Sequence, residues 1–145
     1  MKPKEKTMAG QTGTQEAFAD FISSDNGQTK KANVGNITFN DAKGPRQFVT
    51  NLTIGMFIIN GATKINIDFD TNGELGGGID NGAALPVEIL SNDGVVIYSV
   101  ESVPFNGPCR NGLHHNTATR DLPVEVFNLA GKIRIPNFTV NIYAC

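Results

Sequence analysis

The clearest pattern in the chain is an alternation of hydrophobic and polar residues between Gln47 and Phe69. A period of two is that of a strand with one buried face. Asn60-Gly61 interrupts the alternation and supplies the two positive-φ residues of a tight turn. The stretch therefore predicts a long β-hairpin, whose inward positions are Phe48, Thr50, Leu52, Ile54, Met56 and Ile58 before the turn and Ile65, Ile67 and Phe69 after it.

The first 27 residues show a different pattern. Residues 1–13 are polar and offer nothing that could pack in a core, which predicts an N-terminal arm outside a domain spanning residues 14–145. Thr12-Gly-Thr-Gln15 has the spacing of a capping box. Ala17, Phe18, Phe21 and Ile22 share a helical face, so this region predicts one short N-terminal helix docked on the sheet.

The remaining strands are shorter and are separated by turn signals. Residues 34–39 and 138–143 each alternate hydrophobic and polar side chains, which predicts two further strands. Two long loops are predicted, one at the glycine-rich stretch 70–82 and one at the stretch 103–119, which holds Pro104, Gly107 and Pro108.

The chain also repeats itself. Leu85-Pro-Val-Glu-Ile-Leu-Ser-Asn-Asp-Gly-Val-Val96 resembles Leu122-Pro-Val-Glu-Val-Phe-Asn-Leu-Ala-Gly-Lys-Ile133. Each copy predicts a strand, a turn that ends in glycine and a second strand. Stacked repeat proteins need at least three units to share a core, so these two copies indicate equivalent hairpins on opposing sheets rather than a solenoid.

Together these elements predict the fold class. About seven or eight short strands with few helices are typical of an antiparallel β-sandwich, either jelly-roll or immunoglobulin-like. A Greek-key barrel is the nearest alternative. The order of the strands in the sheets is left open, because strand patterns locate elements better than they pair them.

Composition narrows the function classes. The 145 residues are 39% hydrophobic and 18% charged, which suits one globular domain. A net charge of −2 without a basic stripe argues against nucleic acid as a partner. The longest apolar run, residues 56–59, is far too short for membrane insertion, and no apolar signal core follows the first residues. We expect a soluble protein, and nothing in the sequence indicates its compartment.

One stretch resembles the opening of a calcium loop. Asp68, Asp70, Asn72 and Glu74 place oxygen ligands at alternate positions around Gly73. The EF-hand pattern then fails, because Ile79 stands at the twelfth position and Asp80 follows one place late. The candidate calcium ligands are therefore Asp68, Asp70, Asn72, Glu74 and Asp80 in an irregular loop, and the alternative is a solvated turn.

Cysteine and histidine offer a second candidate. Cys109, His114 and His115 carry the ligand types of zinc and the side chains of a cysteine nucleophile, but no second Cys-x-x-Cys pair supports a metal site. A disulfide is the preferred use of Cys109 and Cys145, formed within one chain or between two. A reducing compartment would leave both as thiols.

Three function classes follow from these observations. The favoured one is a non-catalytic structural or self-assembling subunit, of the capsid, fibre or appendage type, that forms homo-oligomers through its N-terminal arm. The alternative is a ligand-binding sandwich that binds carbohydrate with or without Ca²⁺, although the chain has no Trp and only two Tyr to stack on sugars. An enzyme ranks last, because no catalytic constellation was found. No cofactor besides Ca²⁺ is expected.

Overall fold

A computed structural model of the protein describes residues 8–41, 44–72, 77–107 and 113–144. Within these residues the chain forms eleven strands and one short α-helix, which confirms the all-β sandwich class. The elements are β1 (Met8–Thr14), β2 (Ala17–Asp20), β3 (Ile22–Ser24), the 3-10 turn η1 (Asp25–Gly27), β4 (Thr29–Asp41), β5 (Gly44–Ile59), β6 (Ala62–Asn72), β7 (Gly77–Ser91), β8 (Val96–Gly107), β9 (Leu113–Asp121), α1 (Val124–Leu129), β10 (Ala130–Ile135) and β11 (Thr139–Ala144).

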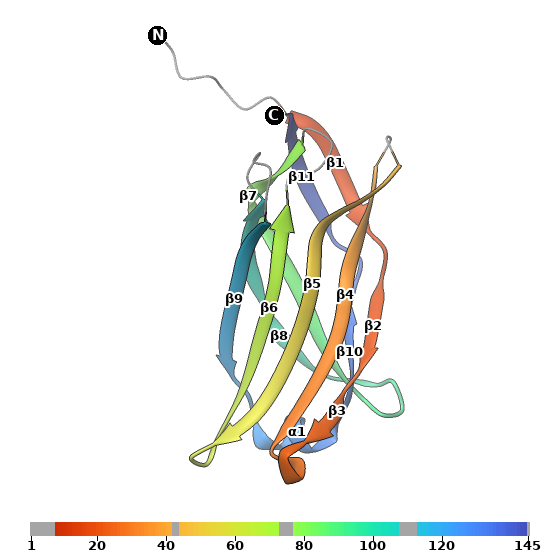
Figure 1. The fold of residues 1–145 in the computed structure, drawn as a ribbon. Coiled ribbons are helices and arrows are strands. Elements are labelled where there is room, and N and C mark those ends of the chain that lie inside the picture. The colour runs from red at the N-terminus through yellow and green to blue at the C-terminus, as the bar shows by residue number, and fades with distance from the viewer. Residues whose placement is uncertain (1–7, 42–43, 73–76, 108–112, 145) are drawn as a thin grey trace.

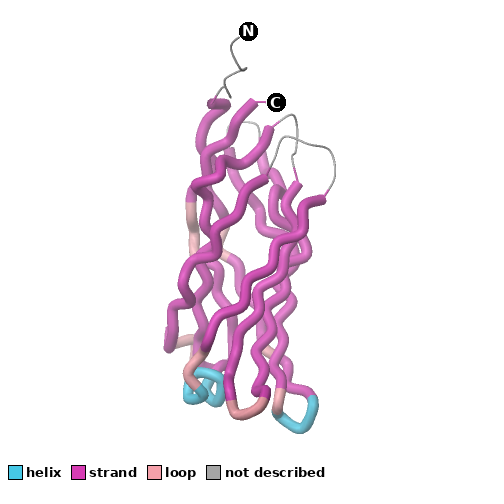
Figure 2. Tube along the Cα trace, turned by 90° about the vertical axis from the view of Figure 1, so that its left-hand side faces the viewer, coloured by secondary structure: helices cyan, strands magenta, loops and turns pink. Residues whose placement is uncertain are grey.

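The strands make two layers that share one hydrophobic core. Strands β9, β6, β5 and β4 form one layer, and β8, β7, β10, β11 and β2 lie behind them (Figure 1). Strand β1 pairs with both β11 and β4 and so joins the layers by hydrogen bonds. The order is β2-β10-β7-β11-β1-β4-β5-β6-β9, with β8 paired to β7 and β3 paired to β4. The molecule is elongated, and its helical segments lie at the end away from the termini (Figure 2).

The predicted hairpin is confirmed as β5 and β6. Its turn residues have positive φ, 48° at Asn60 and 76° at Gly61. The alternation is interrupted once, because Asn51 (φ 56°) forms a bulge between the pairs that Thr50 and Thr53 make with β6. Its fully buried side chains are Phe48, Val49, Leu52, Ile54, Met56, Ile65, Ile67 and Phe69.

A chain of phenylalanine rings connects the two layers. Phe39 of β4 meets Phe48 of β5 at 5.7 Å and Phe138 at 5.6 Å, measured between ring centroids. Phe105 of β8 meets Phe69 of β6 at 5.4 Å and Phe138 at 6.5 Å. All four pairs are edge-on, the geometry that the ring quadrupoles favour. These contacts fix the separation of the layers in the half of the molecule nearer the termini.

The predicted N-terminal helix is wrong. Residues 17–20 form β2, which pairs with β10 so that Ala17 lies opposite Ile135 and Ala19 opposite Ile133. Ala17 and Ala19 therefore turn toward the core, while Phe18 and Asp20 turn outward. Pairing with β10 prevails because β2 is too short for a stable helix and an apolar strand lies beside it. The short helix that the structure contains, α1, lies near the other end of the chain.

The predicted arm needs a new boundary. Strand β1 begins at Met8, and residues from Met8 to Gly13 pair with β11 while Gly13 and Thr14 pair with β4. Backbone pairing holds this strand in the sheet, and the side chains of Thr12 and Thr14 are buried. Residues 8–13 thus belong to the sheet, and residues 1–7 lie outside the described residues.

Both predicted long loops are shorter than expected. Strand β6 continues to Asn72 and β7 begins at Gly77, where Gly77 and Gly78 pair with β11. Strand β8 continues to Gly107 and β9 begins at Leu113, which places both histidines in a strand. Glycine has no side chain to pack, but the backbone hydrogen bonds to β11 hold it in the ladder.

The two repeat copies differ in structure. The first copy, residues 85–96, forms the end of β7, a turn and the start of β8, as predicted. The second copy, residues 122–133, forms α1 followed by β10, so its predicted first strand is wrong. Helix α1 contacts β6, β7 and β8 and covers the end of the core (Figure 1).

No helix among the described residues has both the length and the apolar character needed to cross a membrane.

Candidate functional site

A group of polar side chains interacts on the outer face of β6 and β9. Residues at alternate positions of a strand share a face, so Asp68 and Asp70 of β6 both point away from the core. His115 lies directly opposite Asp70 in the pairing of β6 with β9. We call Asp68, Asp70 and His115 the His115 cluster.

In this cluster the imidazole lies between the two carboxylates. His115 Nδ1 is 3.0 Å from Asp70 Oδ1, and His115 Nε2 is 3.4 Å from Asp68 Oδ1. The His115 side chain is 63% exposed, whereas that of Asp70 is 19% exposed. The cluster is therefore a surface feature whose second carboxylate is partly shielded.

The electrostatics of the cluster favour the charged forms. The hydrogen bond with Asp70 raises the pKa of His115 above its usual 6.5, and the charges of Asp70 and Asp68 act in the same direction. Hydrogen bonds from His115 and Asn51 lower the pKa of Asp70 below its usual 3.8. An imidazolium donates from both nitrogens, so protonated His115 can donate to both carboxylates at once.

Asparagine and threonine side chains extend the cluster across the sheet. Asn51 Nδ2 donates to Asp70 Oδ2 at 3.2 Å, and Asn66 Nδ2 donates to Asp68 Oδ2 at 2.5 Å. Asn66 Oδ1 in turn accepts hydrogen bonds from Thr117 at 3.2 Å and Thr119 at 3.0 Å. The result is a connected polar network over β5, β6 and β9.

This geometry is that of a link between strands. A general base needs a free nitrogen within hydrogen-bond reach of its substrate, whereas both nitrogens of His115 face carboxylates. Among the residues that the structure describes, no three His, Cys, Asp or Glu side chains are arranged to bind a metal ion. The His115 cluster therefore ties β9, which pairs with β6, to the rest of its layer.

The structure places the predicted calcium ligands in different elements. Asp68, Asp70 and Asn72 lie in β6 rather than in a loop, and Asp80 lies in β7. Glu74 falls outside the described residues. The alternate spacing that resembled a calcium loop is, in this structure, the period of a strand, and the two described carboxylates contact His115. Calcium binding stays a prediction.

The second predicted site is described only in part. His114 and His115 are neighbours in β9, so their side chains leave the strand on opposite faces. Cys109 and Cys145 both fall outside the described residues, and the disulfide stays a prediction.

Sequence reasoning missed Asn51 and Asn66. Asn51 has positive φ and forms a bulge, for which asparagine is one of the few suitable residues besides glycine. An asparagine that breaks the alternation after Thr50 is the signal that could have revealed it. Asn66 gives no such signal, because an outward polar residue in a strand is ordinary.

Comparison with known proteins gives little information. No protein-family model and no curated protein matches the sequence. Among solved structures, the chain is similar to the enzymatically active domain of tailspike protein 4 of bacteriophage CBA120, with 16% sequence identity and a TM-score of 0.27. The alignment covers 95% of this chain but spans only 19% of the tailspike chain. A similarity this weak supports no conclusion about function.

Proposed function

We propose that the protein is a non-catalytic structural subunit that assembles with copies of itself. The observation that supports this is a group of large aliphatic side chains exposed at one end of the molecule. We call this group the apolar end; its members and their exposed fractions are Ile22 (72%), Ile59 (57%), Val124 (45%) and Leu129 (59%). Exposed apolar groups of this kind are characteristic of protein contact surfaces.

These four residues lie on adjoining elements. The Ile58 N–H donates to the Gln28 carbonyl at 3.0 Å, which joins the end of β5 to the turn after β3. The Leu122 N–H donates to the Thr63 carbonyl at 3.0 Å, which joins the segment before α1 to the start of β6. Lys30 of β4 donates to the Phe127 carbonyl of α1 at 2.5 Å. The hairpin turn, α1 and β3 therefore lie together at one end (Figure 1).

Free sheet edges, among them β8 and β9, could provide a second contact. Within the described residues β8 pairs only with β7, and β9 pairs only with β6. An unpaired edge offers backbone donors and acceptors to a strand from another chain. In this proposal residues 1–7 of one subunit pair with such an edge of the next. Because the arm and the edge are different surfaces, this contact joins subunits head to tail into rings or filaments.

The test measures molecular mass in solution by light scattering after size exclusion. Leu129→Glu places a charge in the apolar end and should lower the mass of the assembly. Val95→Glu is the matched control, because Val95 is also exposed (61%) but lies in the turn between β7 and β8. Removing residues 1–7 tests the arm and leaves β1 intact.

A full-length protein that is monomeric at high concentration would overturn the proposal. Equal masses for wild type and Leu129→Glu would show that the apolar end is not a subunit contact. An unchanged mass after removal of residues 1–7 would show the same for the arm.

Carbohydrate binding is the second candidate function. The observation that favours it is a surface hollow beside the exposed ring of Phe18. Ca²⁺ binding belongs to this candidate function as a separate site, at residues 68–80, which do not line the hollow. An ion that binds only the native state raises the melting temperature as its concentration rises. Melting curves that coincide in millimolar Ca²⁺ and in chelator would remove calcium from the function.

A further inference from the structure

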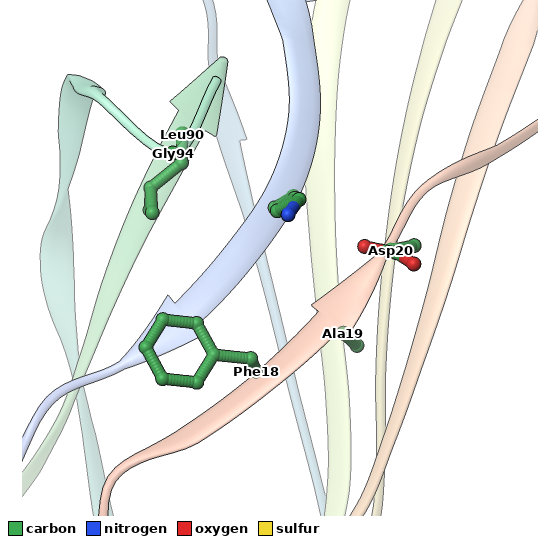
Figure 3. A pocket seen from close by; sticks show the side chains of 6 residues that line it. Phe18, Ala19, Asp20, Leu90 and Gly94 are labelled. Carbon is green, nitrogen blue, oxygen red and sulfur yellow. The ribbon is translucent and has the colours of Figure 1, made fainter. Parts of the chain in front are cut away.

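A surface hollow lies between β2, β10 and the turn that follows β7. Its volume is about 320 Å³. Figure 3 shows Phe18, Ala19 and Asp20 in succession on β2, with Leu90 and Gly94 across β10 from them. The residues that line the hollow are Phe18, Ala19, Asp20, Leu90, Gly94 and Lys132.

Strand pairing explains why these side chains meet. In the antiparallel pair of β2 and β10, Asp20 lies opposite Lys132 and Phe18 lies opposite Arg134. Lys132 also lies opposite Leu90 in the pair of β10 and β7. Residues that lie opposite each other point to the same side of a sheet. Asp20, Lys132 and Leu90 therefore form one row across three strands, and Phe18 and Arg134 belong to the next row.

One part of the hollow is apolar. Phe18 is 57% exposed, although burying an aromatic ring is strongly favourable. Leu90 beside it is only 4% exposed and is fixed by the sheet. Gly94 adds no side chain, and a Cβ built on it meets nothing within 4 Å, so the backbone of the turn leaves the approach open.

The other part is polar but has no net charge. Asp20 and Lys132 contribute one negative and one positive charge to the lining. In the next row Arg134 contacts Glu88 at 3.2 Å and also pairs with Glu16, so its charge is compensated. A charged ligand would gain from one partner and be repelled by the other. A neutral ligand that both donates and accepts hydrogen bonds suits the pair better.

We propose that this hollow binds a single neutral sugar ring. A pyranose has an apolar face of C–H groups that can lie on the ring of Phe18. Its hydroxyl groups can donate to the Asp20 carboxylate and accept from the Lys132 ammonium. The volume is at the lower limit of small-molecule sites, roughly 300–1,000 Å³, and suits one ring rather than a chain of them. The inference does not depend on assembly.

The test is an NMR titration of the ¹⁵N-labelled full-length protein with glucose, galactose, mannose and N-acetylglucosamine. At least one of them should shift the amide signals of residues 18–20, 90–94 and 132. Phe18→Ala should weaken that binding about tenfold, the effect of losing one aromatic contact. Asp20→Asn should weaken it too, since it keeps the shape but removes the charge.

Ile22→Ala is the matched control, because Ile22 is also an exposed apolar residue, on β3, and does not line the hollow. It should leave sugar binding unchanged. The proposal fails if none of the sugars shifts these signals at millimolar concentrations, or if Phe18→Ala binds as wild type does while its other signals show a native fold. Phenol serves as a comparison probe. Shifts with phenol alone would overturn sugar binding and assign the hollow to an aromatic side chain of a partner protein.

Discussion

The two repeat copies have similar sequences but different secondary structures. Leu85-Pro-Val-Glu-Ile-Leu lies within β7, whereas Leu122-Pro-Val-Glu-Val-Phe leads into α1. Both copies nevertheless bury their first, fifth and sixth residues, whereas the third and the twelfth are each buried in one copy and exposed in the other. The pattern of hydrophobic residues therefore specified only part of the burial, and it did not specify the backbone conformation.

Neighbouring strands decide the conformation of the first copy. Val87 pairs with Val100 of β8, and Ile89 pairs with both Tyr98 of β8 and Ile133 of β10. Pro86 cannot donate a backbone hydrogen bond, and it falls where the pairing with β8 shifts by one residue. A proline is tolerated at such a bulge.

Within the described residues, the second copy has no strand partner at the same point. The pairing of β9 with β6 ends at Asp121, and the Leu122 N–H makes the last bond to that layer. Pro123 then begins a helical turn, and its carbonyl accepts from Val126 at 3.0 Å and Phe127 at 3.3 Å. A helix of six residues is unstable alone, so burial of its side chains must hold it in place.

The largest expected effect comes from removing that burial. Phe127 is 3% exposed, and Phe127→Ala should lower the free energy of unfolding by about 3–5 kcal/mol, as is typical of buried aromatic truncations. Urea unfolding measures it. Leu129→Ala on the same helix is the control and should change stability by less than about 0.5 kcal/mol, because Leu129 is exposed. Similar losses in both variants would contradict the explanation that burial of Phe127 holds the helix in place.

Lys30 should have the next largest effect. Its ammonium donates to the Phe127 carbonyl in α1 at 2.5 Å and to the Ala130 carbonyl at 2.9 Å, just after the helix, where the last carbonyls of a helix lack an intrahelical partner. Lys30→Met keeps the aliphatic stem and removes the donors, so we expect a loss of about 1.5–3 kcal/mol. Lys31→Met, on the exposed face of β4, is the control. An unchanged stability in Lys30→Met would show that the second copy needs no cap from β4.

The glycines shared by the copies should respond differently to alanine. A Cβ on Gly131 would lie 2.1 Å from Asn92 Oδ1 and 2.8 Å from Asn92 Cα, so Gly131→Ala should cost about 1–3 kcal/mol through overpacking. Gly94, its equivalent, has open space but a φ of 83°, so Gly94→Ala should cost about 1–2 kcal/mol through backbone strain.

Asn92→Ala separates the two causes. It should recover part of the loss in Gly131→Ala, because the nearest clash is with the Asn92 side chain, and none of the loss in Gly94→Ala. Equal recovery in both backgrounds would contradict this explanation.

The smallest expected effect is a pH dependence of the stability of β9, the strand that leads into the second copy. Because the pKa of His115 is raised, its contribution to stability is complete below pH 6.5 and is lost as pH rises through the folded-state pKa. Because the pKa of Asp70 is lowered, its contribution is complete above pH 3.8 and is lost as pH falls through the folded-state pKa. Both charges stabilise β9 between these limits.

Amide-exchange protection factors can test this. Those of β9 should decrease slightly from pH 6 to pH 8, while those of β7, which carries the first copy, should stay constant apart from any global change. His115→Gln should abolish the difference. A decrease of the same size in β7 would indicate a global effect rather than an effect of the His115 cluster.

Some of the candidate chemistry was readable from the sequence and some was not. The oxygen-bearing side chains of Asp68 and Asp70 were recognised, but their partner His115 is 45 residues further on than Asp70 and was assigned to a loop. The partner of a side chain across a sheet depends on strand register, which local pattern does not contain. The hollow beside Phe18 was missed for the same reason, because it combines residues of three separate segments.

The sequence by itself determined the all-β class and the β5–β6 hairpin, because strict alternation and an Asn-Gly turn are local signals that need no partner. Tertiary structure alone decided that residues 17–20 form a strand, that the glycines of β7 join the sheet and that one repeat copy is helical. In each of these segments the local preferences are weak or evenly matched. Hydrogen bonding to a neighbouring strand, or its absence, then outweighs them, and the neighbour is known only once the whole chain is folded.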